Sequence, residues 1–174
     1  MKKEYNEMIR VNQAGEFGAQ VIYKGQIAAL KLKGDEETVA LVEHMKEQED
    51  VHFEYFDNKL KKEKIRPTVM HPLWKVGGFA MGFLTALADK KAAMTCTTAV
   101  EEVIDEHYQE QLRYLDKEGD HGDLKEKINQ FREEELEHRD IGYEHNAKDL
   151  KCFQPLSFFI KGATKFAISV SKKI

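Results

Sequence analysis

The chain has 174 residues, of which 41% are hydrophobic and 33% are charged. This length suits one domain with a sizeable core and is short for two, and the composition excludes an intrinsically disordered protein. The net charge of −4, without a coherent basic stripe, argues against a nucleic-acid-binding protein, and the two cysteines, Cys96 and Cys152, lie far apart without a CxxC partner and predict no disulfide.

Few glycines and prolines interrupt the chain, and no stretch shows the period of two that marks a strand. The pattern therefore predicts an all-α protein. Six helical segments are expected, at about 5–33, 36–64, 72–89, 92–117, 124–150 and 156–171. Gly34 is expected to end the first segment, Asp35 to cap the second, "EGDHGD" (118–123) to end the fourth, and the fifth should stop before Pro155.

In the first predicted helix, a single carboxylate interrupts an apolar stripe. Ile9 and Asn12 lead to Glu16 at helical spacing, and apolar residues continue the same face beyond it. The second predicted helix carries Glu49 and His52 on its apolar face, as an inward-pointing E-x-x-H pair. Both helices therefore direct ionisable side chains toward the core.

The fourth and fifth predicted helices repeat this arrangement. Glu101 lies on the apolar face of the fourth, whereas Glu102 lies one step around the helix and is less well aimed. In the fifth, the stripe that begins at Leu124 continues through a second E-x-x-H pair, Glu135 and His138. Within the same segment, Glu134 flanks the stripe, and two further carboxylates are expected to face solvent, Glu133 and Glu137.

The chain thus contains two copies of one pattern, in which a helix with one inward glutamate precedes a helix with E-x-x-H. Alone, each element is more often a satisfied core side chain than a ligand. Together, four carboxylates and two imidazoles in one core would cost on the order of several kcal/mol per uncompensated charge, unless cations neutralised them. Ferritin-like di-iron bundles use this ligand set. The predicted metal ligands are Glu16, Glu49, His52, Glu101, Glu135 and His138.

The fold expected from this pattern is a ferritin-like four-helix bundle with two additional apolar or amphipathic helical segments. An oxygen-rich site with one imidazole per ion suits iron or manganese better than zinc. Iron is preferred, because an open di-ferrous carboxylate site suits O₂ chemistry. Two iron ions are therefore the expected cofactor.

Four segments resemble the demethoxyubiquinone hydroxylases of ubiquinone biosynthesis: "MIRVNQAGEFGAQVIYKGQIAAL", "RPTVMHPLWKVGGFAMGFLTAL", "TTAVEEVIDEHYQEQL" and "FREEELEHRDIGYEH". The resemblance covers about residues 8–172 and puts the iron ligands at the same six positions. It implies an O₂-dependent di-iron monooxygenase that hydroxylates the ring of a polyprenylated demethoxyubiquinol. It also implies reducing equivalents from NADH, although the chain has no GxGxxG motif. It draws attention to His107 and Tyr108 as catalytic residues, whereas Tyr23 is more often core packing.

Two segments suggest a membrane surface. Residues 76–88 are thirteen apolar or small residues, fewer than the ~20 that a spanning helix needs. They follow Trp74 and the basic run 59–66, and residues 151–174 hold five lysines and no carboxylate. These features predict interfacial attachment to anionic lipid, through which a long isoprenoid substrate would enter. The alternative is a buried core helix with lysines that only solvate loop ends.

We therefore expect one di-iron helical-bundle domain over 1–174, with membrane-interacting segments at about 67–90 and 153–172. The resemblance implies a peripheral position on the cytoplasmic face of a bacterial inner membrane, or on the matrix side of the mitochondrial inner membrane for a processed eukaryotic form. The expected partners are a membrane-embedded quinol, O₂, anionic lipid, and either further copies of the chain or a ubiquinone-biosynthesis complex. Two alternatives stay open: a ferritin-like iron-oxidising or peroxide-scavenging protein, and a non-catalytic membrane-bound scaffold.

Overall fold

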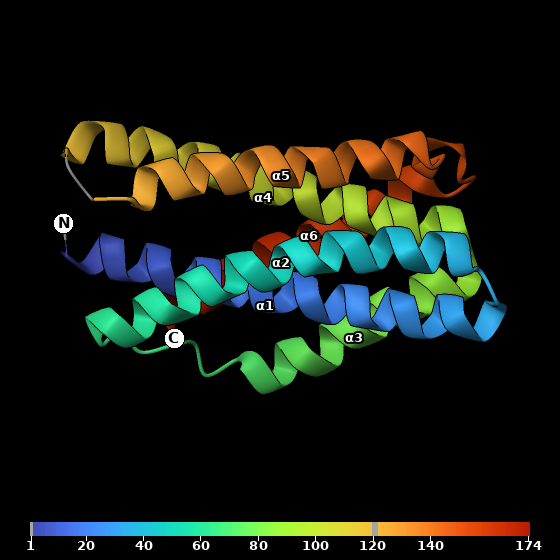
Figure 1. Ribbon diagram of the computed structural model, residues 1–174, viewed down its shortest axis with the longest axis horizontal. Helices are drawn as coiled ribbons and strands as arrows, with labels where there is room; N and C mark the ends of the chain where they lie inside the picture. The colour runs from blue at the N-terminus through green and yellow to red at the C-terminus, as the bar shows by residue number, and fades with distance from the viewer. Residues whose placement is uncertain (1, 120–121) are drawn as a thin grey trace.

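The computed structural model describes residues 2–119 and 122–174 (Figure 1). Its described residues form six α-helices and one 3-10 turn and no strand, which confirms the all-α fold class. In chain order the elements are α1 (Lys2–Lys33), α2 (Glu36–Glu63), α3 (His71–Ala88), α4 (Lys90–Glu118), α5 (Leu124–Glu144), η1 (Ala147–Asp149) and α6 (Phe153–Lys173).

Four long helices, α1, α2, α4 and α5, run side by side along the long axis of the molecule (Figure 1). Within this bundle α1 packs on α2, and α4 packs on α5. The two remaining helices cover the outside: α3 lies along α1 and also contacts α4, whereas α6 lies on α4 and α1. This is the four-helix bundle with two additional helices that the ligand pattern predicted.

Most helix boundaries follow the caps that the sequence predicted. Gly34 ends α1 with φ +69°, and Asp35 caps α2, where its carboxylate accepts a hydrogen bond from the Thr38 amide at 3.2 Å. Gly119 ends α4 with φ +94°. Two residues of the expected breaker segment 118–123, residues 120 and 121, lie outside the described part of the chain.

Two boundaries near the C-terminus differ from the prediction. The expected end of the fifth helix at residue 150 is wrong, because Asn146 adopts the left-handed conformation with φ +66° and stops α5 at Glu144. The short turn η1 follows, and its buried Ala147 carbonyl accepts a hydrogen bond from Thr95 at 3.2 Å. The last helix begins at Phe153, because Pro155 is tolerated in a first turn, where its missing N–H would have no partner.

Glycines allow α3 to pack directly on the backbone of α1. A Cβ atom added at Gly82 would lie 2.0 Å from the Ile22 carbonyl oxygen, and one added at Gly25 would lie 2.3 Å from the Phe79 carbonyl oxygen. No side chain larger than hydrogen fits either position without movement of a helix. The outer helix is therefore held against the helix that carries Glu16.

The outer helices expose apolar side chains and border a cavity. On α3, Val76 and Leu84 are 69% and 61% exposed, and on α6, Phe158 and Phe159 are 82% and 68% exposed. A largely apolar cavity of about 320 Å³ lies beneath these helices, with α1 and α4 forming its inner wall. Within the described residues, no helix has the length and apolarity that a bilayer crossing requires.

Candidate metal centre

Six ionisable residues meet in the middle of the bundle, and none of these residues is more than 3% exposed. They form two groups, and in each group the ligand atoms lie within 4.8 Å of one another. The first group is Glu16, Glu49, His52 and Glu135, and the second is Glu49, Glu101, Glu135 and His138. Glu49 and Glu135 belong to both groups, so the two groups share two carboxylates.

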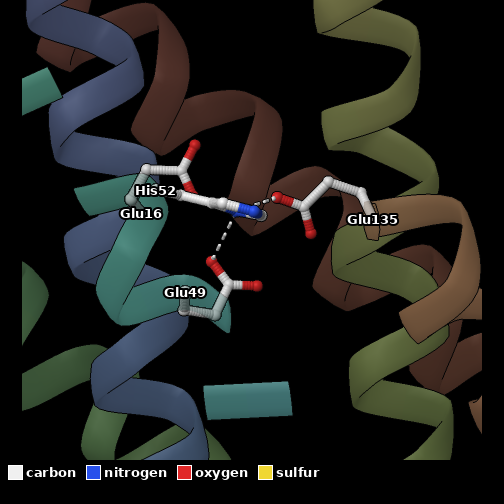
Figure 2. A group of neighbouring side chains, drawn as sticks. All are labelled: Glu16, Glu49, His52 and Glu135. Carbon is white, nitrogen blue, oxygen red and sulfur yellow. Dashed lines mark hydrogen bonds and ion pairs between the residues drawn. The ribbon is translucent and has the colours of Figure 1, made fainter. Parts of the chain in front are cut away.

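The two histidines present the same nitrogen to the cluster. Nδ1 of His52 lies 3.2 Å from a Glu135 oxygen and 3.6 Å from a Glu16 oxygen. Figure 2 shows this imidazole between the carboxylates of Glu16, Glu49 and Glu135. Nδ1 of His138 lies 3.2 Å from Glu49 and 3.3 Å from Glu135. Each imidazole therefore offers Nδ1 to one of the two groups.

Two tyrosines support the single glutamates of the opposite helices. The Tyr23 hydroxyl on α1 donates a hydrogen bond to Glu101 on α4 at 2.9 Å, and the Tyr108 hydroxyl on α4 donates to Glu16 on α1. Each tyrosine lies seven residues after the glutamate of its own helix. The two halves of the centre thus exchange equivalent contacts.

Several buried polar atoms of the cluster make no hydrogen bond, which tests whether the site fits a cation. They are both carboxylate oxygens of Glu49, one oxygen each of Glu101 and Glu135, and Nδ1 of His138. A buried polar atom without a partner costs about 1–3 kcal/mol, so native proteins rarely leave five of them together. Oxygen and imidazole donors are ligands for divalent iron or manganese. The residues present therefore fit a pair of such ions.

The protonation of the cluster reflects the same excess of negative charge. Burial raises the pKa of Glu49 well above its usual value, and the neighbouring Glu135 and Glu16 carboxylates raise it further. Burial alone would lower the pKa of His52, but its contacts with Glu135 and Glu16 raise it to about 12. Contacts with both histidines hold the pKa of Glu135 low against the effect of its burial. Protons therefore neutralise part of this charge when no metal is bound.

His107 lies away from the six ligands. Its Nε2 accepts a hydrogen bond from the Gln111 amide at 2.7 Å, and Gln111 in turn exchanges hydrogen bonds with Asn12. Burial, with a smaller contribution from Lys172, lowers the pKa of His107 to about 4, so the imidazole is neutral. Tyr108 contacts a predicted ligand and His107 does not. The catalytic role of both residues stays a prediction.

Three further carboxylates of the sequence pattern lie outside the cluster. Glu102 is half-buried and binds the Tyr143 hydroxyl and the Lys161 ammonium on neighbouring helices, so it is engaged outside the cluster. Glu133 and Glu137 are exposed, as the helix register predicted.

The helix register assigns no role to Gln48 and places Glu134 beside the apolar stripe. Glu134 binds Nε2 of His52 at 2.6 Å, and the Gln48 side-chain oxygen binds Nε2 of His138 at 2.8 Å. Their position in the sequence was an available signal, because each residue immediately precedes the glutamate of an E-x-x-H pair.

Comparison with known proteins identifies the family. The family described as ubiquinone biosynthesis protein COQ7 matches residues 3–171. The chain is 48% identical to the 3-demethoxyubiquinol 3-hydroxylase of Rhodospirillum rubrum, over 97% of this chain and 78% of that protein. It is 44% identical to the mitochondrial NADPH-dependent 3-demethoxyubiquinone 3-hydroxylase of Dictyostelium discoideum, over 96% and 76%, and 41% identical to the human protein of that name, over 97% and 77%. With nearly its whole length matched and its six candidate ligands gathered in one buried cluster, the chain belongs to the COQ7 family of ubiquinone biosynthesis proteins.

Proposed function

We propose that this protein is an O₂-dependent di-iron monooxygenase that hydroxylates the ring of a demethoxyubiquinol in ubiquinone biosynthesis. The observation that carries the proposal is the pair of buried ligand groups that share Glu49 and Glu135. Relatives named demethoxyubiquinol and demethoxyubiquinone hydroxylases, at 41–48% identity, support the reaction and the substrate class. The enzyme is thus a hydroxylating oxidoreductase.

The protein residues hold and orient the centre. Bound iron would supply the activation of O₂, from which one oxygen atom reaches the quinol ring. His52 and His138 would bind one ion each through Nδ1, and Glu49 and Glu135 would span both ions. Burial of all six ligands keeps bulk water away from the reaction.

Tyr23 and Tyr108 orient the two glutamates that belong to one group only. Burial and the adjacent carboxylates raise the pKa of both hydroxyls well above the usual tyrosine value, so both keep their protons at neutral pH. Each hydroxyl donates a hydrogen bond to one oxygen of Glu101 or Glu16 and leaves the other oxygen for an ion. We therefore assign both tyrosines to ligand positioning.

The apolar cavity would hold the substrate beside the centre. Gly15 and Ala19 line it on α1 beside Glu16, and Val100 and Ile104 line it on α4 around Glu101. The wall between cavity and cluster thus consists of the two helices that carry the single glutamates. An apolar cavity in this position suits a quinol with a polyprenyl tail.

A peripheral attachment to the membrane that holds the quinol is part of the proposal. The exposed apolar side chains of α3 and α6 would enter the lipid surface. Exposed basic side chains that precede α3 in the chain, including Lys61 and Lys62, would attract anionic headgroups. We place this surface on the cytoplasmic face of a bacterial inner membrane, or on the matrix side of a mitochondrial one. A reduced nicotinamide nucleotide is the proposed electron source, and NADH and NADPH can be compared directly in the assay.

The test combines metal content with turnover on one sample. Protein purified without oxygen and loaded with ferrous iron should bind two ions per chain and convert a demethoxyubiquinol to its hydroxylated product. Isotopically labelled O₂ should place one labelled oxygen atom in that product. Product formation by iron-free protein would refute the di-iron assignment. Iron oxidation that yields no quinol product would favour the ferritin-like alternative.

A further inference from the structure

The metal centre has an approximate two-fold arrangement that is broken at one pair of residues. Its six ligands come from two copies of one pattern, and the two tyrosines exchange equivalent contacts between the halves. Gln48 and Glu134, which bind the outer nitrogens of the two histidines and are called their supports below, also occupy equivalent positions. Gln48 immediately precedes Glu49, and Glu134 immediately precedes Glu135. At this position one half has an amide, Gln48, and the other has a carboxylate, Glu134. The six ligands and the two tyrosines are of the same residue type in both halves.

Each support reaches across to the histidine of the other half. Glu134 on α5 binds Nε2 of His52 on α2 at 2.6 Å, and Gln48 on α2 binds Nε2 of His138 on α5 at 2.8 Å. In both imidazoles Nδ1 faces the cluster, so Nε2 is the nitrogen that carries the outward hydrogen bond. Glu134 is itself oriented by the Gln130 amide, which donates to its second oxygen at 3.0 Å.

The two supports differ in charge and therefore act differently on their histidines. A carboxylate that accepts the outer N–H of a ligating imidazole makes the ligand more basic and strengthens its bond to the metal. A neutral amide oxygen accepts the same hydrogen bond but adds no negative charge. The Glu134 side chain is only 25% exposed, so solvent screens its charge incompletely at this short distance.

We propose that the pairing of Glu134 with His52 and of Gln48 with His138 makes the two metal positions unequal, with the ion at His52 bound more tightly. This inference rests on the proposed function only in assuming that two ions bind. Glu134 and Gln48 are positioning residues that act through the histidines. The ion at His52 should also be the more readily oxidised of the two, because a more basic ligand favours the ferric state.

The experiment titrates metal-free wild-type protein with ferrous iron in the absence of oxygen and follows binding by calorimetry. Two separate binding steps are expected. Glu134→Gln should weaken the tighter step by about 10–100-fold and bring the two steps together, whereas Gln48→Glu should strengthen the weaker step. The double variant, Glu134→Gln with Gln48→Glu, should restore two separate steps, because the carboxylate now supports His138. Such a rescue would not follow if these residues only maintained the fold.

Matched controls separate this effect from general electrostatics. Glu133→Gln removes a charge from an exposed neighbour, and Asn58→Asp adds one at an exposed position on α2, so neither should change either step. His138→Ala leaves the position at His52, where the remaining step should respond to Glu134→Gln and not to Gln48→Glu. Mössbauer spectra of iron-loaded protein provide an independent readout, in which two distinct iron signals of the wild type should converge in each single variant.

Three results would overturn the inference. They are unchanged binding steps in Glu134→Gln, equal shifts of the same step in both single variants, and a double variant in which both binding steps are weaker than in the wild type. If the wild type binds two ions and only these shifts fail, the proposed hydroxylase function stands. If the wild type binds no iron, both the inference and the proposed function fall.

Discussion

Replacement of Gly82 by alanine tests whether α3 packs on α1 through bare backbone. Helix propensity alone favours alanine over glycine by about 1 kcal/mol. In the folded protein, however, the new Cβ would lie 2.0 Å from the Ile22 carbonyl oxygen, whereas real Cβ atoms essentially never approach closer than 3.0 Å. The two helices would have to separate locally by about 1 Å, because the obstacle is backbone and not the end of a flexible side chain.

The expected balance is a loss of stability. Overpacking of this kind costs about 1–3 kcal/mol, and an obstacle made of backbone belongs in the upper part of that range. After the gain in propensity, Gly82→Ala should lower the free energy of unfolding by about 1–2 kcal/mol. For a chain of this size the midpoint temperature should fall by about 2–8 °C.

Gly77 on the same helix provides the control, because a Cβ there would meet no atom within 4 Å. Gly77→Ala should therefore raise stability by about 0.5–1 kcal/mol. Thermal unfolding followed by circular dichroism measures both variants, and iron content should be unchanged because neither position touches the cluster. If Gly82→Ala proves as stable as Gly77→Ala, the close approach of α3 to α1 is refuted.

Three further predictions concern the centre and the surface. Glu135→Ala or His138→Ala should abolish quinol hydroxylation and leave a folded helical protein, whereas Glu137→Ala should cost little; comparable losses in a turnover assay would contradict the assigned helix register. Val76→Ser with Leu84→Ser should release the protein from vesicles of anionic lipid in a flotation assay. The same variant should depress turnover of a long-tailed quinol more than turnover of a short-tailed analogue. Equal loss of both activities would argue that α3 is a core helix. Metal-free protein should lose stability as the pH rises from about 6 to about 9, because Glu49 and His52 have raised pKa values and the folded state holds more protons than the unfolded state. Denaturant unfolding at both pH values checks this, and higher stability at the higher pH would contradict it.

The helical register was enough to predict which side chains converge. The apolar stripe through Leu124 and Phe131 leads to Glu135 and His138, and a stripe of this kind must face the core wherever the helix packs. The apolar stripes of the other three long helices likewise predict their inward side chains. All six predicted ligands lie within the two buried groups, because each depends only on the period of its own helix.

The period of a single helix does not predict contacts between helices. The bond from Glu134 to His52 depends on how far α5 is rotated and shifted along α2, which the period of one helix does not fix. The close approach of Gly82 to Ile22 likewise depends on where α3 crosses α1. The end of α5 was missed for a local reason, because Asn146 takes a left-handed conformation that asparagine tolerates but does not require.

Asp89 joins α3 to α4 without an intervening loop. Its amide donates to the Thr85 carbonyl at 3.1 Å, and its carboxylate accepts from the Lys91 amide at 2.7 Å, so one residue closes one helix and opens the next. By contrast, seven residues, 64–70, separate α2 from α3. Through this corner and its backbone contact with α1, α3 is mechanically coupled to the two helices that carry Glu101 and Glu16. A displacement of α3 would therefore act most directly on α1 and α4, because α3 packs on these two helices among the described residues.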